Sequence, residues 1–429
     1  MSAGIYAILL SVVMVIAVAW PLLLAIPTLH SRLYWPRHLA IVPAALLVVL
    51  PGNVSLQLPW LLFGTRFTID GTTRWVLAMS VVIWFTAATM MMMKPSKQGF
   101  ANERSTTFFL LTLAGNLGAV LASDLVSFFC FSTIMSYGFY GLFIQNGNAA
   151  TQHAGRLYLI FLIVADLLLF EALLLAAFTT DNLRFEGVRE AMAKASSSQF
   201  YLWVTFIGFA LKTGIWPAHL WLSSVFKSTN QTTALLIIGV PIVMGWLGAA
   251  RWLPLGEHAF GISAMIIQMV GVIVVLYATL KLFTQASVKI VWATSGATGL
   301  FITALGTGLA HPTVWRQYEY LSYPFITSLG ILLALLIFAI GRTQETRHQQ
   351  PAIALQRMKA LSRWIGATRQ WVEDRLLGLQ SLCHVSWLKV AKHYQCVNHW
   401  QKLRGFTTGW STAITLFVLL GLALTWLAA

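Results

Sequence analysis

The sequence predicts an all-α protein that crosses a membrane about twelve times, because the chain is long, apolar and nearly free of charge. It has 429 residues, of which 58% are hydrophobic and 10% are charged, with a mean hydropathy of +0.74. Soluble domains carry about 25% charged residues, so the composition excludes an ordinary soluble enzyme. The net charge of +15 is spread over short loops and one amphipathic segment, which argues against a nucleic-acid-binding protein.

Apolar runs long enough to cross a bilayer recur from the beginning of the chain to its end. The first run has no basic start and no clear cleavage site, so we predict a retained span and not a signal peptide. A shorter run at residues 39–50 is counted as a further crossing. The predicted spans are 5–26, 39–50, 74–93, 107–122, 125–145, 156–179, 200–226, 232–252, 261–281, 288–310, 320–341 and 409–428.

The basic residues predict how the chain is oriented. With the N-terminus outside, 20 Lys and Arg residues fall on the cytoplasmic side, eleven of them in residues 342–408, and seven fall outside. This asymmetry follows the positive-inside rule. We therefore expect a multi-pass protein of the inner (plasma) membrane with both termini outside.

Two segments between the spans are predicted to lie outside the bilayer. Residues 51–73 are too polar to cross, and the alternation in VSLQL and TRFTI, with Asp70-Gly71 as a turn signal, predicts an external hairpin. Residues 180–199 are predicted to form an external loop.

The segment 342–408 has apolar residues at three- and four-residue steps, which predicts an amphipathic helix. Such a helix lies on the inner membrane surface, or against neighbouring spans or a partner. The predicted regions are 1–106 (N-terminal spans), 107–253 (first repeat), 254–341 (shortened second repeat), 342–408 (basic cytoplasmic segment) and 409–429 (final span).

Lys212 is the most informative residue, because it lies in the apolar stretch FIGFALKTGIWPAHLWL at residues 206–222. An ammonium inside a bilayer costs about 2.5–3.5 kcal/mol or more. Pro217 has no N–H, so the helix is predicted to break there. A charge beside a broken helix is a common design of ion sites in transporters. The alternatives are a lysine that reaches the membrane surface, or one that is buried against another subunit.

Four stretches together resemble the antiporter-like subunits shared by respiratory complex I, membrane-bound hydrogenases, Mrp antiporters and inorganic-carbon uptake complexes. They are LQLPWLLFGTRFTIDGTTRWVLAM, LAGNLGAVLASDLVSFFCFSTIMSYGFYGLF, the Lys212 stretch with its continuation, and TQASVKIVWATSGATGLFITALG. The resemblance covers most of residues 50–310. It implies that protons move along a central line of charged residues.

Several residues of that line have counterparts here. Lys212 matches the lysine of the broken seventh span, with Pro217 and His219 in the family's pattern. Asp124 matches an acidic residue at the head of the fifth span, and Lys289 matches a lysine at the start of a later span.

The chain also departs from the family pattern. The fifth-span glutamate that pairs with the lysine falls on Thr133, and the eighth-span lysine falls on Val243. After residue 310 only one span, 320–341, precedes the amphipathic segment. The second inverted repeat is therefore predicted to be truncated.

Asp166 and Glu171 are the candidates to replace the missing counter-ion of Lys212. They lie five residues apart on one predicted helix, about 140° around its axis, so they do not share a face. We favour Asp166; the alternative is that each acid pairs with a neighbouring subunit or is held protonated by desolvation. His219 has the chemistry of a proton relay, or it is a plain hydrogen-bonded histidine. Asp124 lies on the proton line or only caps a helix.

The sequence contains no nucleophile–base arrangement, phosphate-binding loop or cysteine–histidine cluster, so no catalytic site, cofactor or metal site is predicted. We expect a proton-translocating subunit of a membrane complex, with catalysis in a peripheral cytoplasmic partner, and we favour an inorganic-carbon uptake complex. One alternative is an arm subunit of a complex I-like oxidoreductase or hydrogenase. Another is a structural anchor that no longer conducts.

Overall fold

The computed structural model describes residues 3–26, 37–61, 64–92, 103–145, 149–215, 219–228, 231–284 and 289–317. The chain divides into two compact units, Met1–Leu282 with Ser287–Gly341, and Phe283–Ala286 with Arg342–Ala429. The predicted spans 320–341 and 409–428 and the amphipathic segment 342–408 lie outside the described residues.

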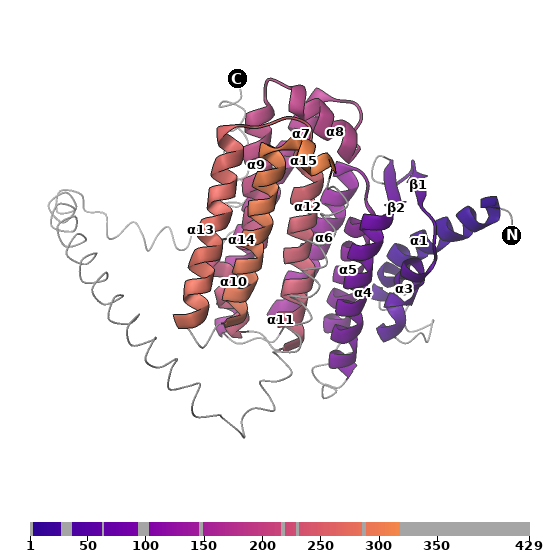
Figure 1. Cartoon of the computed structure of the whole chain (residues 1–429). Helices are drawn as coiled ribbons and strands as arrows, with labels where there is room; N and C mark the ends of the chain where they lie inside the picture. The colour runs from indigo at the N-terminus through magenta and orange to yellow at the C-terminus, as the bar shows by residue number, and fades with distance from the viewer. Residues whose placement is uncertain are drawn as a thin grey trace, which may run out of the picture. The chain divides into compact units, whose positions relative to one another are not determined.

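The first unit is a bundle of apolar helices, as the sequence predicts (Figure 1). Seven of the described helices are long and apolar enough to cross a membrane, by length and composition. The total of about twelve crossings stays a prediction. The helices that open the bundle are α1 (Ala3–Ala25), η1 (Arg37–Ile41), α3 (Val42–Val49), α4 (Gly71–Met92), α5 (Glu103–Leu121), α6 (Leu125–Ile144) and α7 (Ala149–Thr179).

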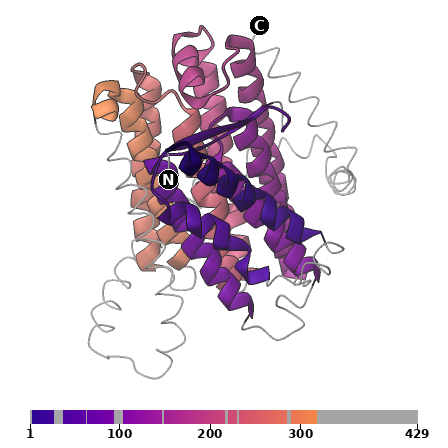
Figure 2. The same ribbon diagram turned by 90° about the vertical axis from the view of Figure 1, so that its right-hand side faces the viewer.

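The remaining helices complete the bundle beside α6 and α7. They are α8 (Phe185–Lys194), α9 (Ser198–Thr213), α10 (Leu220–Ser228), α11 (Gln231–Ile237), η2 (Ile238–Ile242), α12 (Val243–Trp252), α13 (Ile262–Thr284), α14 (Lys289–Ala310) and α15 (Pro312–Gln317). In Figure 1, α13 and α14 lie at one edge, and α1 with the strands lies at the other. Figure 2 shows α1 and the strands in front of the other helices.

The predicted hairpin is present as β1 (Val54–Leu58) and β2 (Thr65–Ile69), which pair antiparallel with Leu56 opposite Phe67. The turn signal predicted at Asp70-Gly71 does not join the two strands, so this prediction was wrong. Asp70 follows the second strand, and its Oδ1 accepts from Thr73 N at 2.7 Å. An aspartate that accepts a hydrogen bond three residues on begins a helix, so Asp70 starts α4.

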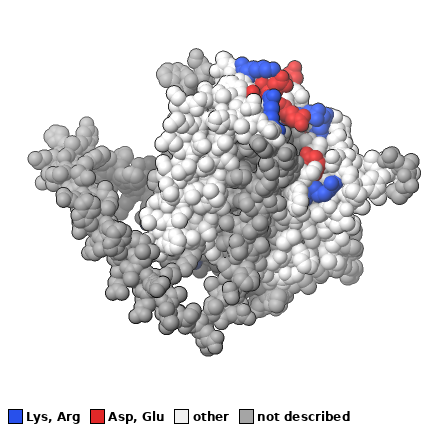
Figure 3. Space-filling view, in the orientation of Figure 1, with Lys and Arg blue, Asp and Glu red and all other residues white. Residues whose placement is uncertain are grey.

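The external loop predicted at 180–199 contains a helix, α8, so this expectation needs correction. Phe185, Val188 and Met192 are buried, and this spacing of three and four residues favours a helix. Figure 3 shows charged side chains gathered at the end of the bundle that carries α8 and α15. The segments predicted to lie outside share this end. Which side of the membrane it faces stays a prediction.

Close contact between α5 and α6 fixes the centre of the bundle. A Cβ atom at Gly115 would collide with the backbone of Met135, and one at Gly138 would lie 2.8 Å from Thr112 Oγ1. Small residues at such positions let membrane helices approach closely. This packing holds α6 in place, and α6 supplies two of the polar groups described below.

Two helices of the bundle are irregular, and both border the same site. The α9 helix ends at Thr213, because Gly214 adopts a left-handed conformation with φ of 68°. Gly214 N donates to Leu211 O, and Ile215 N donates to Ala210 O at 3.2 Å, which is a Schellman ending. The predicted break is therefore present, although Pro217 itself lies outside the described residues.

The second irregular helix is the run from α11 to α12, which contains a π-helical turn at Ile238–Ile242. Pro241 lies inside this turn. Because proline has no N–H, it cannot continue the regular ladder of hydrogen bonds. Such turns are frequent at functional sites.

Candidate functional site: a buried lysine–aspartate pair

Lys212 lies in the last turn of α9 and is buried, with 8% of its surface exposed. The carbonyl groups at a helix C-terminus carry a partial negative charge that stabilises a cation. The left-handed Gly214 ends the helix directly after this turn. The local sequence therefore places the ammonium group where the helix end favours it.

The carboxylate of Asp166 on α7 faces Lys212, and the distance between Lys212 Nζ and Asp166 Oδ1 is 2.7 Å. Both side chains are buried, with 6% and 10% of their surfaces exposed. Lys212 Nζ also donates to Ser132 Oγ at 3.4 Å. Among the described residues, no group donates a hydrogen bond of good geometry to either oxygen of Asp166. The ammonium is therefore the main stabilising group of this carboxylate.

A small cavity lies beside the pair, with a volume of about 10 Å³, enough for about one water molecule. Lys212, Ser136 and Tyr158 contribute polar groups to its lining. The rest of the wall is formed by Phe161, Leu162, Leu211, Trp221 and Pro241. Tyr158 Oη donates to Ser136 O at 3.3 Å. Ser136 Oγ in turn donates to Ser132 O at 2.8 Å, so both hydroxyl groups of the lining are held by backbone carbonyl groups of α6.

The α10 helix closes the break over this cavity. Trp221 Nε1 donates to Leu211 O at 3.2 Å, and the Trp221 ring lies 5.1 Å from the Tyr158 ring. The freed backbone at the end of α9 is thus satisfied by the next helix segment. As a result, α10 packs against the end of α9 although the helix is interrupted between them.

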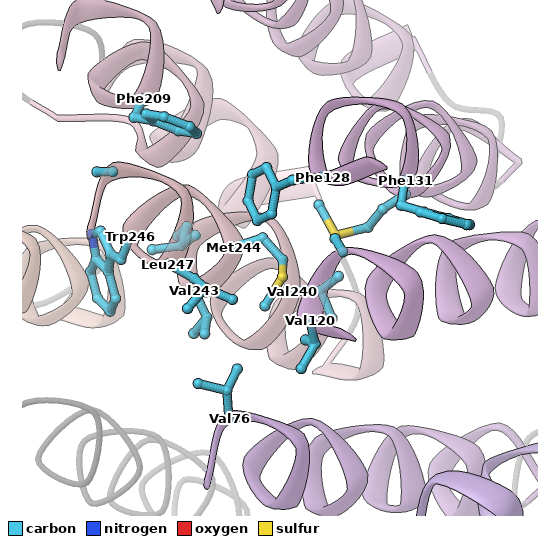
Figure 4. Packing of buried hydrophobic residues seen from close by; sticks show 14 of the residues in the cluster. Val76, Val120, Phe128, Phe131, Phe209, Val240, Val243, Met244, Trp246 and Leu247 are labelled. Atoms are coloured by element: carbon cyan, nitrogen blue, oxygen red, sulfur yellow. The ribbon is translucent and has the colours of Figure 1, made fainter. Parts of the chain in front are cut away.

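At two positions where the family has a charged residue, this chain has the uncharged residues Val243 and Thr133. Val243 is 7% exposed and belongs to the apolar core. Figure 4 shows it among apolar side chains, with Leu247 and Val76 nearby. Thr133 Oγ1 is buried and has no hydrogen-bond partner among the described residues. The counter-charge of Lys212 comes from α7 instead of from α6.

The other predicted site residues are not all gathered around Lys212. Asp124 is the N-cap of α6, where its carboxylate accepts from Ser127 N at 2.8 Å and from Arg66 N at 3.0 Å. This geometry agrees with the capping interpretation, and a place on a proton path stays a prediction. The ring of His219 lies 5.4 Å from the ring of Trp292 on α14. His219 does not line the cavity beside Lys212.

Glu171 is partly exposed, whereas Asp166 is buried, which agrees with the different faces predicted for them. Lys289 is the first residue of α14, and its side chain lies outside what the structure describes. The roles predicted for Glu171 and Lys289 on a proton path therefore stay predictions.

Sequence reasoning missed the hydroxyl groups that accompany the pair. Ser132 and Ser136 lie four residues apart on α6, so they share a face. In the stretch FSTIMSYGF this spacing was the available signal, but serines in apolar helices are common. Tyr158 carried no signal, because only the packing of α7 against α6 shows where its hydroxyl group points.

A buried charged pair beside a broken helix, inside a bundle of apolar helices, is typical of the ion sites of membrane transporters. The model of the family described as NADH:quinone oxidoreductase/Mrp antiporter, TM, matches residues 122–367. The chain belongs to this family.

Curated relatives are similar over part of their length. Chain 4 of an NAD(P)H-quinone oxidoreductase from Synechococcus elongatus is 25% identical over 253 residues, which is 56% of this chain and 45% of the relative. A chloroplastic chain 4 from Chlorokybus atmophyticus is 26% identical over 208 residues, which is 47% of this chain and 40% of the relative. The chain therefore spans about half the length of the curated relatives it matches.

Two solved structures share the fold. One is of the membrane-bound sulfane sulfur reductase, an archaeal respiratory membrane complex, with a TM-score of 0.58 and 17% identity over 76% of this chain and 55% of the other. The other is of the Mrp complex from Dietzia sp., with a TM-score of 0.62 and 16% identity over 77% of this chain and 37% of the other. These likenesses support the membrane fold.

Proposed function

We propose that the chain is a proton-translocating antiporter-like subunit of a multi-subunit membrane complex, with Lys212 and Asp166 as its proton-binding groups. The observation that carries this proposal is the 2.7 Å contact between Lys212 Nζ and Asp166 Oδ1. It supplies the counter-charge that the family's fifth-span glutamate would otherwise provide.

The chemistry of the pair supports proton movement. A buried ammonium keeps its proton only while an opposite charge is near, because burial disfavours the charged form of lysine. If Asp166 moves away, Lys212 releases a proton. Asp166 has no other donor among the described residues, so its carboxylate gains a proton when the ammonium leaves it.

Groups that border the pair offer a route for the released proton. Ser132 Oγ accepts from the ammonium, and the cavity lined by Ser136 and Tyr158 has room for about one water molecule. At the far end of α10, Ser224 and Ser228 make the segment polar. We propose that protons enter from this end, which the positive-inside rule assigns to the cytoplasm.

The identity of the complex is a further part of the proposal. We favour an inorganic-carbon uptake complex of the plasma membrane, with the N-terminus outside, in which the chain energises a peripheral cytoplasmic subunit. The similarity to chain 4 of NAD(P)H-quinone oxidoreductases supports an arm of a respiratory complex as the second candidate.

The test is Lys212→Ala in membrane vesicles that contain the intact complex, with proton uptake measured by a pH-sensitive dye. We expect proton-coupled activity to disappear. Lys194→Ala is the matched control, because Lys194 is an exposed lysine on α8, outside the proposed path, and it should leave the activity unchanged. Unchanged activity in Lys212→Ala would identify the chain as a structural anchor.

A second measurement distinguishes the two complexes. If the first candidate is correct, purification of the tagged chain should recover a peripheral zinc-bearing subunit. Cells that contain the intact complex should then accumulate bicarbonate. Quinone reduction by the purified complex would favour the respiratory arm.

A further inference from the structure

Glu171 is a carboxyl group on the outer face of a long apolar helix. The α7 helix has 31 residues and is among the helices able to cross a membrane. Glu171 is partly exposed and makes no ion pair or hydrogen bond with any residue that the structure describes. It therefore differs from Asp166, which the same helix turns inward to Lys212.

The face around Glu171 is apolar. Large side chains lie above and below it at helical spacing, and four of them are clearly exposed: Ile160 (57%), Val164 (38%), Leu174 (38%) and Phe178 (89%). These positions and Glu171 fall within a narrow stripe on a helix of 3.6 residues per turn. The carboxyl group thus lies at the centre of an apolar stripe.

Its depth makes this position costly. Glu171 lies eight residues before the end of α7 at Thr179, about 12 Å along the helix axis. A bilayer has a hydrocarbon core of about 30 Å. At this depth a carboxylate that faced lipid would be disfavoured, and intramembrane acids normally find a partner.

No Lys or Arg among the residues that the structure describes pairs with Glu171. Lys212 is taken by Asp166. The two apolar stretches outside the described residues, 318–341 and 405–429, contain no Lys or Arg. A second copy that met this face symmetrically would bring Glu171 against its own equivalent, so two like charges would meet.

We propose that the stripe around Glu171 on α7 is the docking surface for a membrane helix of a different subunit, which presents a Lys or Arg to this carboxylate. The apolar residues pack against that helix, and the ion pair fixes its depth and rotation, because a lone charge pair inside a membrane has a strong positional preference. The interface does not depend on whether Lys212 conducts protons.

A hydrophobic carbodiimide tests this proposal, because it adds to carboxyl groups that carry a proton in an apolar environment. The reagent is applied to membranes that contain the intact complex, and in parallel to membranes in which the full-length chain is expressed without its neighbours. The modification of Glu171 is then read by mass spectrometry of its peptide. The solvent-exposed Glu190, which is paired with Lys194, is the negative control and should stay unmodified in both membranes. Glu171→Gln confirms the assignment of the modified peptide.

We expect at least a tenfold lower modification of Glu171 in the intact complex than in the chain alone. Equal modification in both membranes would show that the carboxyl group faces lipid and would overturn the proposal. Absence of modification in both would show that the free chain does not expose Glu171, which would overturn it as well.

Discussion

Lys212 and Arg251 both lie within the helix bundle, but they contact different kinds of groups. Lys212 contacts one carboxylate at 2.7 Å and one hydroxyl group at 3.4 Å. Arg251 donates to the carbonyl oxygens of Ala119, Val120 and Ala122 at 3.0 to 3.2 Å. Its guanidinium carbon also lies 5.4 Å from the centre of the Phe185 ring.

The difference shows which of the two cations can change its charge in this fold. The carbonyl groups at the end of α5 cannot be protonated, and a guanidinium does not give up its proton, so Arg251 acts as a fixed cap. A lysine can lose its proton and a carboxylate can gain one, so the Lys212–Asp166 pair has two charge states. The cavity with room for about one water molecule also lies beside Lys212.

Lys212→Arg gives the Lys212 position a guanidinium group like that of Arg251. We expect it to change proton transport more than any other variant below. The positive charge and its attraction to Asp166 remain, so the protein should fold and assemble. A guanidinium cannot deprotonate, and proton transport should fall about 100-fold or more, the order expected when a proton-transfer group is lost. Proton uptake in vesicles measures the rate. A rate within a factor of two of the wild type would mean that Lys212 only provides charge.

Arg251→Ala removes the fixed cap and should act on stability instead of transport. Several carbonyl groups at the end of α5 lose their donor, and each unpaired buried group costs about 1–3 kcal/mol. We expect a lower thermal midpoint in detergent and an unchanged proton rate per folded molecule. Arg251→Lys should recover only part of the stability, because an ammonium keeps the charge but lacks the planar fork of a guanidinium. A lost proton rate with normal stability would contradict the structural role.

Ser132→Ala tests the weaker contact of Lys212. The hydrogen bond is long, at 3.4 Å, so its loss should cost about 0.5 kcal/mol and change the proton rate about two-fold. Thr133→Val is the matched control, because Thr133 Oγ1 has no partner among the described residues, and it should leave the rate unchanged. A larger effect of Thr133→Val than of Ser132→Ala would show that the family position still matters here.

Lys194→Ala should have the smallest effect, because its ion pair with Glu190 is exposed to solvent. The hydrogen bond and the charge of Lys194 lower the pKa of Glu190, and Glu190 raises the pKa of Lys194. The pair therefore contributes at neutral pH. It loses its contribution as the pH falls through the lowered pKa of Glu190 or rises through the raised pKa of Lys194. Thermal midpoints at neutral pH should agree within measurement error, and a clear drop would reveal a partner at this site.

The sequence predicted the long apolar helices of the described part of the chain, because apolar length is a local property. The number of crossings stays a prediction. The sequence also predicted the break after Lys212, from the missing N–H of Pro217, and the different faces of Asp166 and Glu171, from helix geometry. It misplaced the turn near Asp70 and missed the helix α8. There, a capping aspartate and a short amphipathic pattern resemble turn and loop signals.

The sequence by itself determined that the chain lies in a membrane, that a lysine is retained there at a cost, and that two acids on one helix were available to pair with it. Only the tertiary structure decided which acid does so. That choice depends on how α7 packs against α9, which turns Asp166 inward and leaves Glu171 on the outer face. Charge pairing acts over a few ångströms, whereas sequence periodicity fixes only the face of a helix and not the neighbour that the face meets.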